Sequence, residues 1–168
     1  MKKSSKSSRK QVSISTKKKN SGAKNFGVDI KKGNFLLVTE PFLFVDRITY
    51  RVPGKKVIIE TDITGEEWFF KGHFPGNPIL PGHILAEAMI QAGTFLFEKR
   101  DQSKTVNYLT STKIRFFKIT RPGTTITMTA TPVKIISTAA IIHVDAHVDG
   151  ELISRGDFIV ATRDKDKE

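Results

Sequence analysis

The clearest hydrophobic pattern in the chain is one apolar stretch, residues 82–97, which predicts a helix. Its apolar residues recur at intervals of three and four positions and form a wide apolar face. The interior is filled by Ala, Leu, Met, Glu and Gln, all of which favour helix. Pro81 precedes the stretch and suits a first helical turn, where its missing N–H would have no partner anyway. Glu87 is the only ionisable side chain between His83 and Glu98, so we expect a buried central helix with one acid in it.

Shorter apolar runs elsewhere are typical of strands. Residues 57–63 form one such run, and the C-terminal half contains three more that are rich in Thr, Ile and Val, at residues 126–133, 139–148 and 152–161. Asp149-Gly150, between the last two runs, is a hairpin signal. One long buried helix and several antiparallel strands predict an α+β domain with the sheet wrapped around the helix.

A basic segment precedes the globular part. Residues 1–25 hold nine Lys and Arg side chains and no acidic one. The whole chain has a net charge of +11, so subtracting those nine leaves only +2 for residues 26–168. The basicity therefore belongs to a tail, and nucleic acid is not the expected partner of the fold. Because the segment has few apolar residues, we predict a disordered tail at 1–25 and one folded domain at 26–168.

Two absences narrow the class of protein further. The chain has no cysteine, which excludes disulfides, thiol nucleophiles and cysteine-ligated metals and fits a reducing compartment. No run approaches the roughly 18 consecutive apolar residues of a membrane-spanning helix. We therefore expect a cytoplasmic protein without a membrane span. Organellar targeting by the tail is the less favoured alternative, because the tail prefers Lys to Arg and has no amphipathic period.

The residues best suited to catalysis lie just before and inside the predicted helix. Gly72-His73-Phe74-Pro75-Gly76-Asn77-Pro78 is a loop whose prolines restrict the backbone and can hold a side chain in place. Glu87 follows His73 by fourteen residues, on the helix. A histidine on a restricted loop and an acid on an apolar helix therefore form the candidate pair.

This pair suits the elimination of water from a β-hydroxyacyl thioester. His73 could take the α-proton, because imidazole titrates near neutral pH. Desolvation on an apolar helix favours a neutral carboxyl, so Glu87 could protonate the departing hydroxyl, with Gln91 one turn further on to orient it. Backbone N–H groups near Gly82, at the helix start, could hold the thioester oxygen. A surface histidine and a structural glutamate would show the same residues, so this chemistry alone leaves catalysis and structure open.

A long motif resolves the question by resemblance. GHFPGNPILPGHILAEAMIQ, residues 72–91, resembles the signature of the bacterial-type 3-hydroxyacyl-[acyl-carrier-protein] dehydratases of fatty-acid synthesis. Three further segments agree with that family in the same order: PFLFVDR at 41–47, RFFK at 115–118 with RPG at 121–123, and VDG at 148–150. The resemblance spans roughly residues 40–161, nearly the whole globular part.

The resemblance implies a hotdog fold, a long helix wrapped by an antiparallel sheet. It implies a homodimer, often in a trimer of dimers, with each active site at the dimer interface. His73 matches the family's catalytic histidine, Glu87 its catalytic acid from the other subunit, and Gly82 the backbone amide that meets the thioester carbonyl. The family needs no metal or organic cofactor, and acyl carrier protein carries its substrate. The implied reaction converts 3-hydroxyacyl thioesters into trans-2-enoyl thioesters, and the Glu at position 87 resembles the branch that only dehydrates.

Two positions depart from the family pattern. His83 stands where relatives have a small or aliphatic residue, and we favour a packing or capping role over altered substrate fit. Val38-Thr39-Glu40 replaces a Pro-His-Arg element, which affects the entrance to the site and not the reaction. The sequence does not determine the acyl chain length. It also does not determine whether acyl carrier protein or coenzyme A carries the acyl group.

Other features admit both bland and functional interpretations. Phe74 and other phenylalanines could line an acyl tunnel, although most phenylalanines are simple core. His143 and His147 lie on one strand face about 13 Å apart, too far to share a metal. Four basic residues could bind an acidic carrier protein, or they could be solvent-exposed residues of a sheet edge without a binding role. These four are Lys113, Arg115, Lys118 and Arg121.

Two rival functions follow from the same residues. A hotdog acyl-thioesterase would hydrolyse the thioester with water activated by the same acid, and the HFPG loop argues against it. A non-catalytic acyl-carrier or nucleic-acid binding protein would use the basic tail for affinity, with a steep salt dependence. Deleting residues 1–25 should abolish such binding and leave dehydratase turnover intact.

Overall fold

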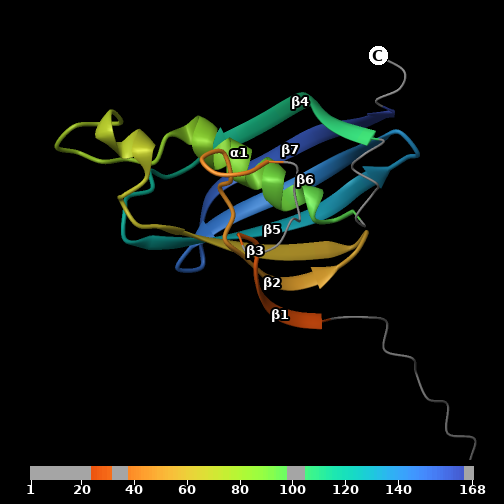
Figure 1. Ribbon diagram of the computed structural model, residues 1–168, viewed down its shortest axis with the longest axis horizontal. Helices are drawn as coiled ribbons and strands as arrows, with labels where there is room; N and C mark the ends of the chain where they lie inside the picture. The colour runs from red at the N-terminus through yellow and green to blue at the C-terminus, as the bar shows by residue number, and fades with distance from the viewer. Residues whose placement is uncertain (1–23, 32–37, 98–104, 165–168) are drawn as a thin grey trace, which may run out of the picture.

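The computed structural model describes residues 24–31, 38–97 and 105–164 (Figure 1). Within these ranges the chain forms one α-helix, one short 3₁₀-helix and seven strands. In chain order they are β1 (Lys24–Asp29), β2 (Arg47–Val52), β3 (Lys56–Ile63), η1 (Trp68–Lys71), α1 (Gly82–Thr94), β4 (Thr105–Phe116), β5 (Thr124–Ile135), β6 (Ala139–Val148) and β7 (Glu151–Asp164). Residues 1–23 of the predicted tail lie outside the described ranges, and β1 begins two residues inside the segment assigned to that tail.

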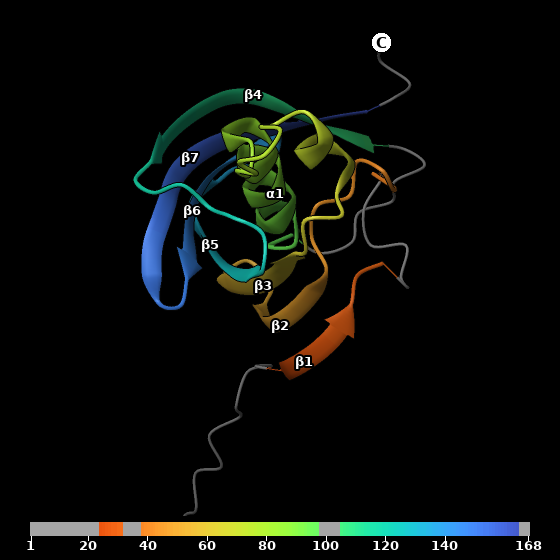
Figure 2. The same ribbon diagram turned by 90° about the vertical axis from the view of Figure 1, so that its left-hand side faces the viewer.

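The seven strands form one antiparallel sheet in the order β1-β2-β3-β5-β6-β7-β4. The segment containing η1 and α1 joins β3 to β4 and so carries the chain from the middle of the sheet to its far edge. Seen end-on, the sheet curls around α1 (Figure 2). This arrangement confirms the predicted α+β hotdog fold.

Helix α1 packs closely on the central strands. It lies mainly against β5 and β6, and its buried residues follow the predicted apolar face: Leu85, Ala88, Met89, Gln91, Ala92 and Gly93. A Cβ placed on Gly93 would come within 3.1 Å of Cγ2 of Ile142 on β6, so the missing side chain permits the close approach. No helix in the described ranges is long and apolar enough to cross a membrane.

Buried and more exposed side chains alternate along the central strands, as expected for a sheet with one face covered by the helix. On β6 every even residue from Ala140 to Ala146 is buried, and the odd residues between them are only partly buried. On β5 the buried Ile126, Met128 and Ala130 alternate with threonines that face away from α1. One face of the sheet thus forms the core with α1, while the other is polar.

Several predicted boundaries agree with the structure. The strand predicted at residues 139–148 matches β6 at both ends, and Asp149 and Gly150 take the positive φ angles, 51° and 79°, of a tight hairpin. The predicted helix, by contrast, ends at Thr94. The reason is a tertiary contact: the Arg51 guanidinium donates to the carbonyls of Phe95 (2.7 Å) and Phe97 (2.6 Å), and so satisfies carbonyls beyond the helix.

Strand β4 lies at the edge of the sheet and was not predicted as a strand. Among the described strands it pairs only with β7. Its register places Leu109, Ile114 and Phe116 on the face that α1 occupies, opposite buried residues of β7. Leu109 and Phe116 nevertheless remain 44% and 46% exposed. Within the described part of the chain, β4 is therefore an edge strand that carries partly exposed apolar side chains.

Candidate active site

His73 lies on a tight loop between η1 and α1. Its backbone N–H donates to the carbonyl of Phe69 (3.0 Å), and its own carbonyl accepts from the N–H of Ile79 (3.1 Å), so the loop closes on itself. The imidazole stacks on the ring of Phe74 with centroids 4.1 Å apart. Phe74 is 50% exposed and lies beside the histidine at the protein surface.

One hydrogen bond defines the tautomer of His73. Its Nδ1 lies 2.8 Å from the carbonyl oxygen of Ile79. A carbonyl can only accept, so Nδ1 carries the proton and the neutral ring presents an unprotonated Nε2. The half-buried His73 is therefore oriented to accept a proton at Nε2.

The loop is attached to the segment between β4 and β5. The N–H of Leu80 donates to the carbonyl of Thr120 at 2.8 Å. Arg121 donates from its guanidinium to Oδ1 of Asn77 at 2.7 Å and reaches the carbonyl of Pro78 at 3.4 Å. Arg121, one of the four residues considered for a basic patch, is thus engaged with the histidine loop.

Glu87 lies in the second turn of α1, half-buried rather than enclosed. Nε2 of Gln91, one turn further along, donates to its Oε1 at 3.0 Å, so the contact expected from their four-residue spacing is present. Gln91 itself is only 3% exposed. The carboxyl is therefore held on one side by a buried amide.

Two backbone groups fix which way the Gln91 amide points. Its Oε1 accepts from the N–H of Phe44 (2.9 Å), and its Nε2 donates to the carbonyl of Phe42 (2.8 Å) as well as to Glu87. Because an N–H can only donate and a carbonyl can only accept, the amide cannot be reversed without losing both bonds. The segment before β2, which contains Phe42 and Phe44, thus orients Gln91, the hydrogen-bond donor to Glu87.

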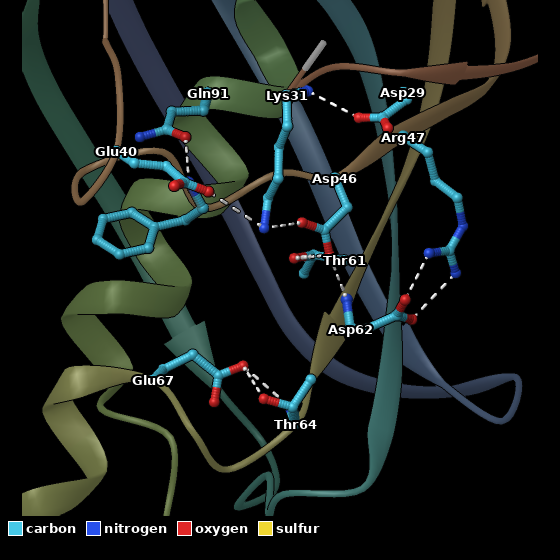
Figure 3. A network of polar contacts seen from close by, with 11 residues as sticks. Asp29, Lys31, Glu40, Asp46, Arg47, Thr61, Asp62, Thr64, Glu67 and Gln91 are labelled. Atoms are coloured by element: carbon cyan, nitrogen blue, oxygen red, sulfur yellow. Dashed lines mark hydrogen bonds and ion pairs between the residues drawn. The ribbon is translucent and has the colours of Figure 1, made fainter.

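A polar network braces that segment from the other side (Figure 3). Lys31 lies 3.0 Å from Oδ1 of Asp46 and 3.6 Å from Oε1 of Glu40, and the hydrogen bond with Asp46 raises the pKa of Lys31. Asp46 also accepts from the N–H of Asp62 on β3 at 2.8 Å. The guanidinium of Arg47 binds Asp62 and lowers the pKa of that carboxyl. Glu40, noted as a departure from the family pattern, is therefore a peripheral ion-pair partner.

Gly82 is the first residue of α1, after Pro81 as the N-cap. An N–H at this position has no intrahelical acceptor and lies at the positive end of the helix dipole. A Cβ on Gly82 would come within 3.2 Å of the Phe116 ring, so that ring lies over the start of the helix. The next residue, His83, is exposed.

The structure brings some of the expected residues together and not others. Glu87 contacts Gln91, and Gly82 lies at the end of the loop that carries His73. No hydrogen bond or ion pair joins His73 to Glu87 within the single chain, among the residues described. The same described residues contain no cluster of His, Asp and Glu side chains arranged to hold a metal ion.

The remaining candidates lie elsewhere on the sheet. Nδ1 of His143 lies 2.6 Å from Oδ1 of Asp157, and its Nε2 lies 3.3 Å from Asp145 on the outer face. Lys118 is ion-paired with Glu151. Of the four basic residues expected to form a patch, two are therefore committed to contacts within the chain.

Comparison with known sequences gives a consistent assignment. A family model described as a FabA-like domain matches residues 37–157. A 3-hydroxyacyl-[acyl-carrier-protein] dehydratase FabZ from Oenococcus oeni is 37% identical over 121 residues, which cover 71% of this chain and 87% of the relative. The FabZ of Clostridium kluyveri is 34% identical over 144 residues, covering 84% and 99%.

Solved structures show the same fold at low sequence identity. A dehydratase heterocomplex, ApeI:P from Xenorhabdus doucetiae, has a TM-score of 0.65 at 12% identity and covers 83% of this chain and 93% of that one. The thioesterase HI1161 from Haemophilus influenzae has a TM-score of 0.52 at 11% identity, covering 70% and 78%. At such identities these structures speak for the fold alone.

Proposed function

The chain belongs to the FabA-like family, and from this membership we propose that it is a hydro-lyase that removes water from 3-hydroxyacyl thioesters and yields trans-2-enoyl thioesters. One observation carries the proposal beyond family membership: the Glu87 carboxyl is held by the buried amide of Gln91. The relatives are named for acyl chains on acyl carrier protein, and we propose the same carrier, in fatty-acid synthesis.

His73 acts as the base. Its free Nε2 takes the α-proton, while the hydrogen bond from Nδ1–H to Ile79 stabilises the imidazolium that results. The electron pair of the broken C–H bond moves toward the thioester carbonyl. The N–H of Gly82 at the start of α1 donates to that carbonyl oxygen and stabilises its developing charge.

Glu87, in its acid form, protonates the leaving hydroxyl. Because Gln91 donates to Oε1, the acidic proton belongs on Oε2. As the C–O bond breaks, this proton leaves with the hydroxyl as water, and the α,β double bond forms. Solvent then removes the proton from His73 and returns one to Glu87. Reversal of the same steps hydrates an enoyl thioester.

We propose that the working unit is a dimer in which β4 of one copy pairs with β4 of another. The edge is long, it pairs with β7 alone among the described strands, and Leu109 and Phe116 are half-exposed on its helix-facing side. A second copy would cover these side chains with its own α1. Glu87 would then face His73 of the other subunit, which accounts for the lack of contact between the two within one chain.

The carrier protein would reach the site beside β4. Lys113 and Arg115 are exposed on that strand, on the face opposite to that of Ile114 and Phe116. Their positive charge suits an acidic carrier protein. We assign the reaction to the cytoplasm, since a chain without cysteine suits a reducing compartment, and cell fractionation would check this assignment.

Enoyl-thioester hydration, followed by loss of ultraviolet absorbance, tests the proposal. Wild-type protein, His73→Ala and Glu87→Gln are assayed with crotonyl and longer enoyl groups on acyl carrier protein and on coenzyme A. We expect each variant to lose on the order of 10²–10⁴ in kcat, the usual contribution of a general acid or base. Retained turnover in either variant removes that residue from the mechanism.

Matched controls separate chemistry from folding. His147→Ala on the outer sheet face and Glu66→Gln on an exposed loop change the same residue types away from the site, and both should keep wild-type rates. No turnover by the wild-type protein on any of the enoyl thioesters would refute the dehydratase function.

Two rival functions give different results in the same assays. A thioesterase would release free thiol from acyl thioesters, which a thiol reagent detects. A nucleic-acid binding protein would lose its affinity when residues 1–23 are removed, a deletion that leaves β1 intact. Under the dehydratase proposal, turnover survives this truncation.

A further inference from the structure

Thr120 carries a buried hydroxyl without a hydrogen-bond partner. The residue is 6% exposed, and among the described residues no group bonds to its Oγ1. A buried unpaired hydroxyl is costly, and such groups are rare in folded proteins. By comparison, the equally buried Thr61 donates from its hydroxyl to Asp46. The buried hydroxyl of Thr120 therefore calls for a partner beyond the described residues.

The position of Thr120 connects it with the candidate site. Its carbonyl accepts the N–H of Leu80 at 2.8 Å. Leu80 lies between Ile79, whose carbonyl orients the His73 ring, and the start of α1 at Gly82. Thr120 thus packs against the stretch of backbone that joins the proposed base to the proposed carbonyl-binding amide.

Neighbouring residues of the same segment border this stretch on both sides. The ring of Phe116 lies over Gly82, and Arg121 binds Asn77. The segment from Phe116 to Arg121 therefore forms a wall along the loop and the helix start. Within this wall Thr120 is the residue whose polar side-chain atom is both buried and unpaired.

We propose that the Thr120 hydroxyl is a hydrogen-bonding group for the thioester end of the substrate. This inference rests on the dehydratase function proposed above. The polar atoms of an acyl thioester near the reacting carbons are its carbonyl oxygen and its β-hydroxyl, and a hydroxyl can donate to either. No described group of the protein bonds this hydroxyl, and bound substrate supplies the partner.

Binding is measured in a His73→Ala background, where turnover does not interfere. In that background Thr120→Val should bind the 3-hydroxyacyl thioester about fivefold to tenfold more weakly than Thr120 does, the value of one hydrogen bond, and Thr120→Ser should stay within about twofold. The same loss should occur with an N-acetylcysteamine thioester, which retains the thioester end and lacks most of the carrier arm. A loss seen only with the full carrier arm would overturn the placement at the thioester.

Stability should change in the opposite direction. Replacing an unsatisfied buried hydroxyl by the methyl of Val removes a desolvation cost, so Thr120→Val should raise the midpoint of thermal unfolding by about 2–4 °C. Thr61→Val removes the hydrogen bond from Thr61 to Asp46 and should lower the unfolding midpoint. If Thr120 had only a structural role, Thr120→Val would not combine a higher unfolding midpoint with weaker substrate binding.

Controls keep the outcomes separate. Thr127→Val on the outer sheet face should change neither binding nor turnover. If Thr120→Val fails to fold, Thr120→Ala and Thr120→Ser, which differ by the hydroxyl alone, replace it in the comparison. Unchanged binding in Thr120→Val with an active wild type refutes the role of Thr120, whereas an inactive wild type refutes the proposed function.

Discussion

Gln91 donates a hydrogen bond from Nε2 to Oε1 of Glu87 across one turn of α1, at 3.0 Å. The same amide is bound by the carbonyl of Phe42 and the N–H of Phe44. A buried side chain therefore links the carboxyl on the helix to a backbone segment more than forty residues earlier in the chain. The position of Glu87 depends on this tertiary contact as well as on the helix.

Replacing Gln91 should lower both the turnover and the stability of the protein. Gln91→Leu removes the donor to Glu87, and we expect kcat to fall about tenfold to hundredfold, the cost of a small misplacement of a reacting group. The freed groups of Phe42 and Phe44 should lower the free energy of unfolding by about 1–3 kcal/mol. Steady-state kinetics measures the loss of turnover, and urea unfolding measures the loss of stability. An unchanged kcat in Gln91→Leu would contradict the positioning role.

Strand β4 should control assembly. Leu109→Lys places a charge on the half-exposed apolar edge, so we expect the dimer to dissociate and activity to fall with it. Sedimentation velocity and turnover, both over a range of protein concentrations, measure this. Val133→Lys, an exposed apolar residue of β5 away from that edge, is the matched control. Retention of the dimer in Leu109→Lys would place the interface elsewhere.

Mixed dimers should recover activity that neither parent has. If Glu87 serves the His73 of the other subunit, a dimer of one His73→Ala chain and one Glu87→Gln chain contains one intact site. Random mixing after reversible unfolding should then restore about a quarter of wild-type turnover, because half of the dimers are mixed and each has one of two sites. Absence of any recovery would show that each site is built within one chain.

Gly156 should tolerate no side chain. A Cβ there would come within 2.7 Å of the ring of Phe158, which is fully buried and cannot move aside. Gly156→Ala should therefore lower the free energy of unfolding by about 1–3 kcal/mol through overpacking. Gly27→Ala, where nothing lies within 4 Å of the added atom, is the control for urea unfolding. Equal midpoints for the two variants would contradict the close packing.

The ion pair of Asp145 should make a pH-dependent contribution to stability. The hydrogen bond from Arg155 holds the pKa of Asp145 below its usual value, so the carboxylate favours the folded state above the unfolded pKa of about 3.9. This stability is lost as the pH falls through the lower folded pKa. Asp145→Asn should therefore be less stable than wild type at pH 7, and the difference should shrink below about pH 4. Urea midpoints of the two proteins measured from pH 7 to pH 3 test this prediction. A stability difference that grows as the pH falls would contradict it.

Local pattern predicted the helix, the hairpin and the Glu87–Gln91 contact correctly, because each depends on residues within a few positions of one another. The pattern missed β1, β2 and β4. The sequence of β4 alternates weakly, and its only described partner is β7, 38 to 59 residues later. It also placed the helix end too late, because Arg51 binds the following carbonyls from another strand.

The amino-acid pattern alone identifies the chemical groups of the candidate site: an imidazole on a proline-restricted loop and one acid on an apolar helix. It also shows that the basic residues are concentrated in the segment at the start of the chain. How these groups are held depends on contacts between segments that are distant in the chain. The tertiary structure bound Nδ1 of His73 to the carbonyl of Ile79, it placed Arg121 on the histidine loop instead of in an open basic patch, and it buried the hydroxyl of Thr120 beside that loop. Periodicity reports which face of an element is buried, whereas a hydrogen-bond partner is chosen by segments that meet only when the sheet has closed around the helix.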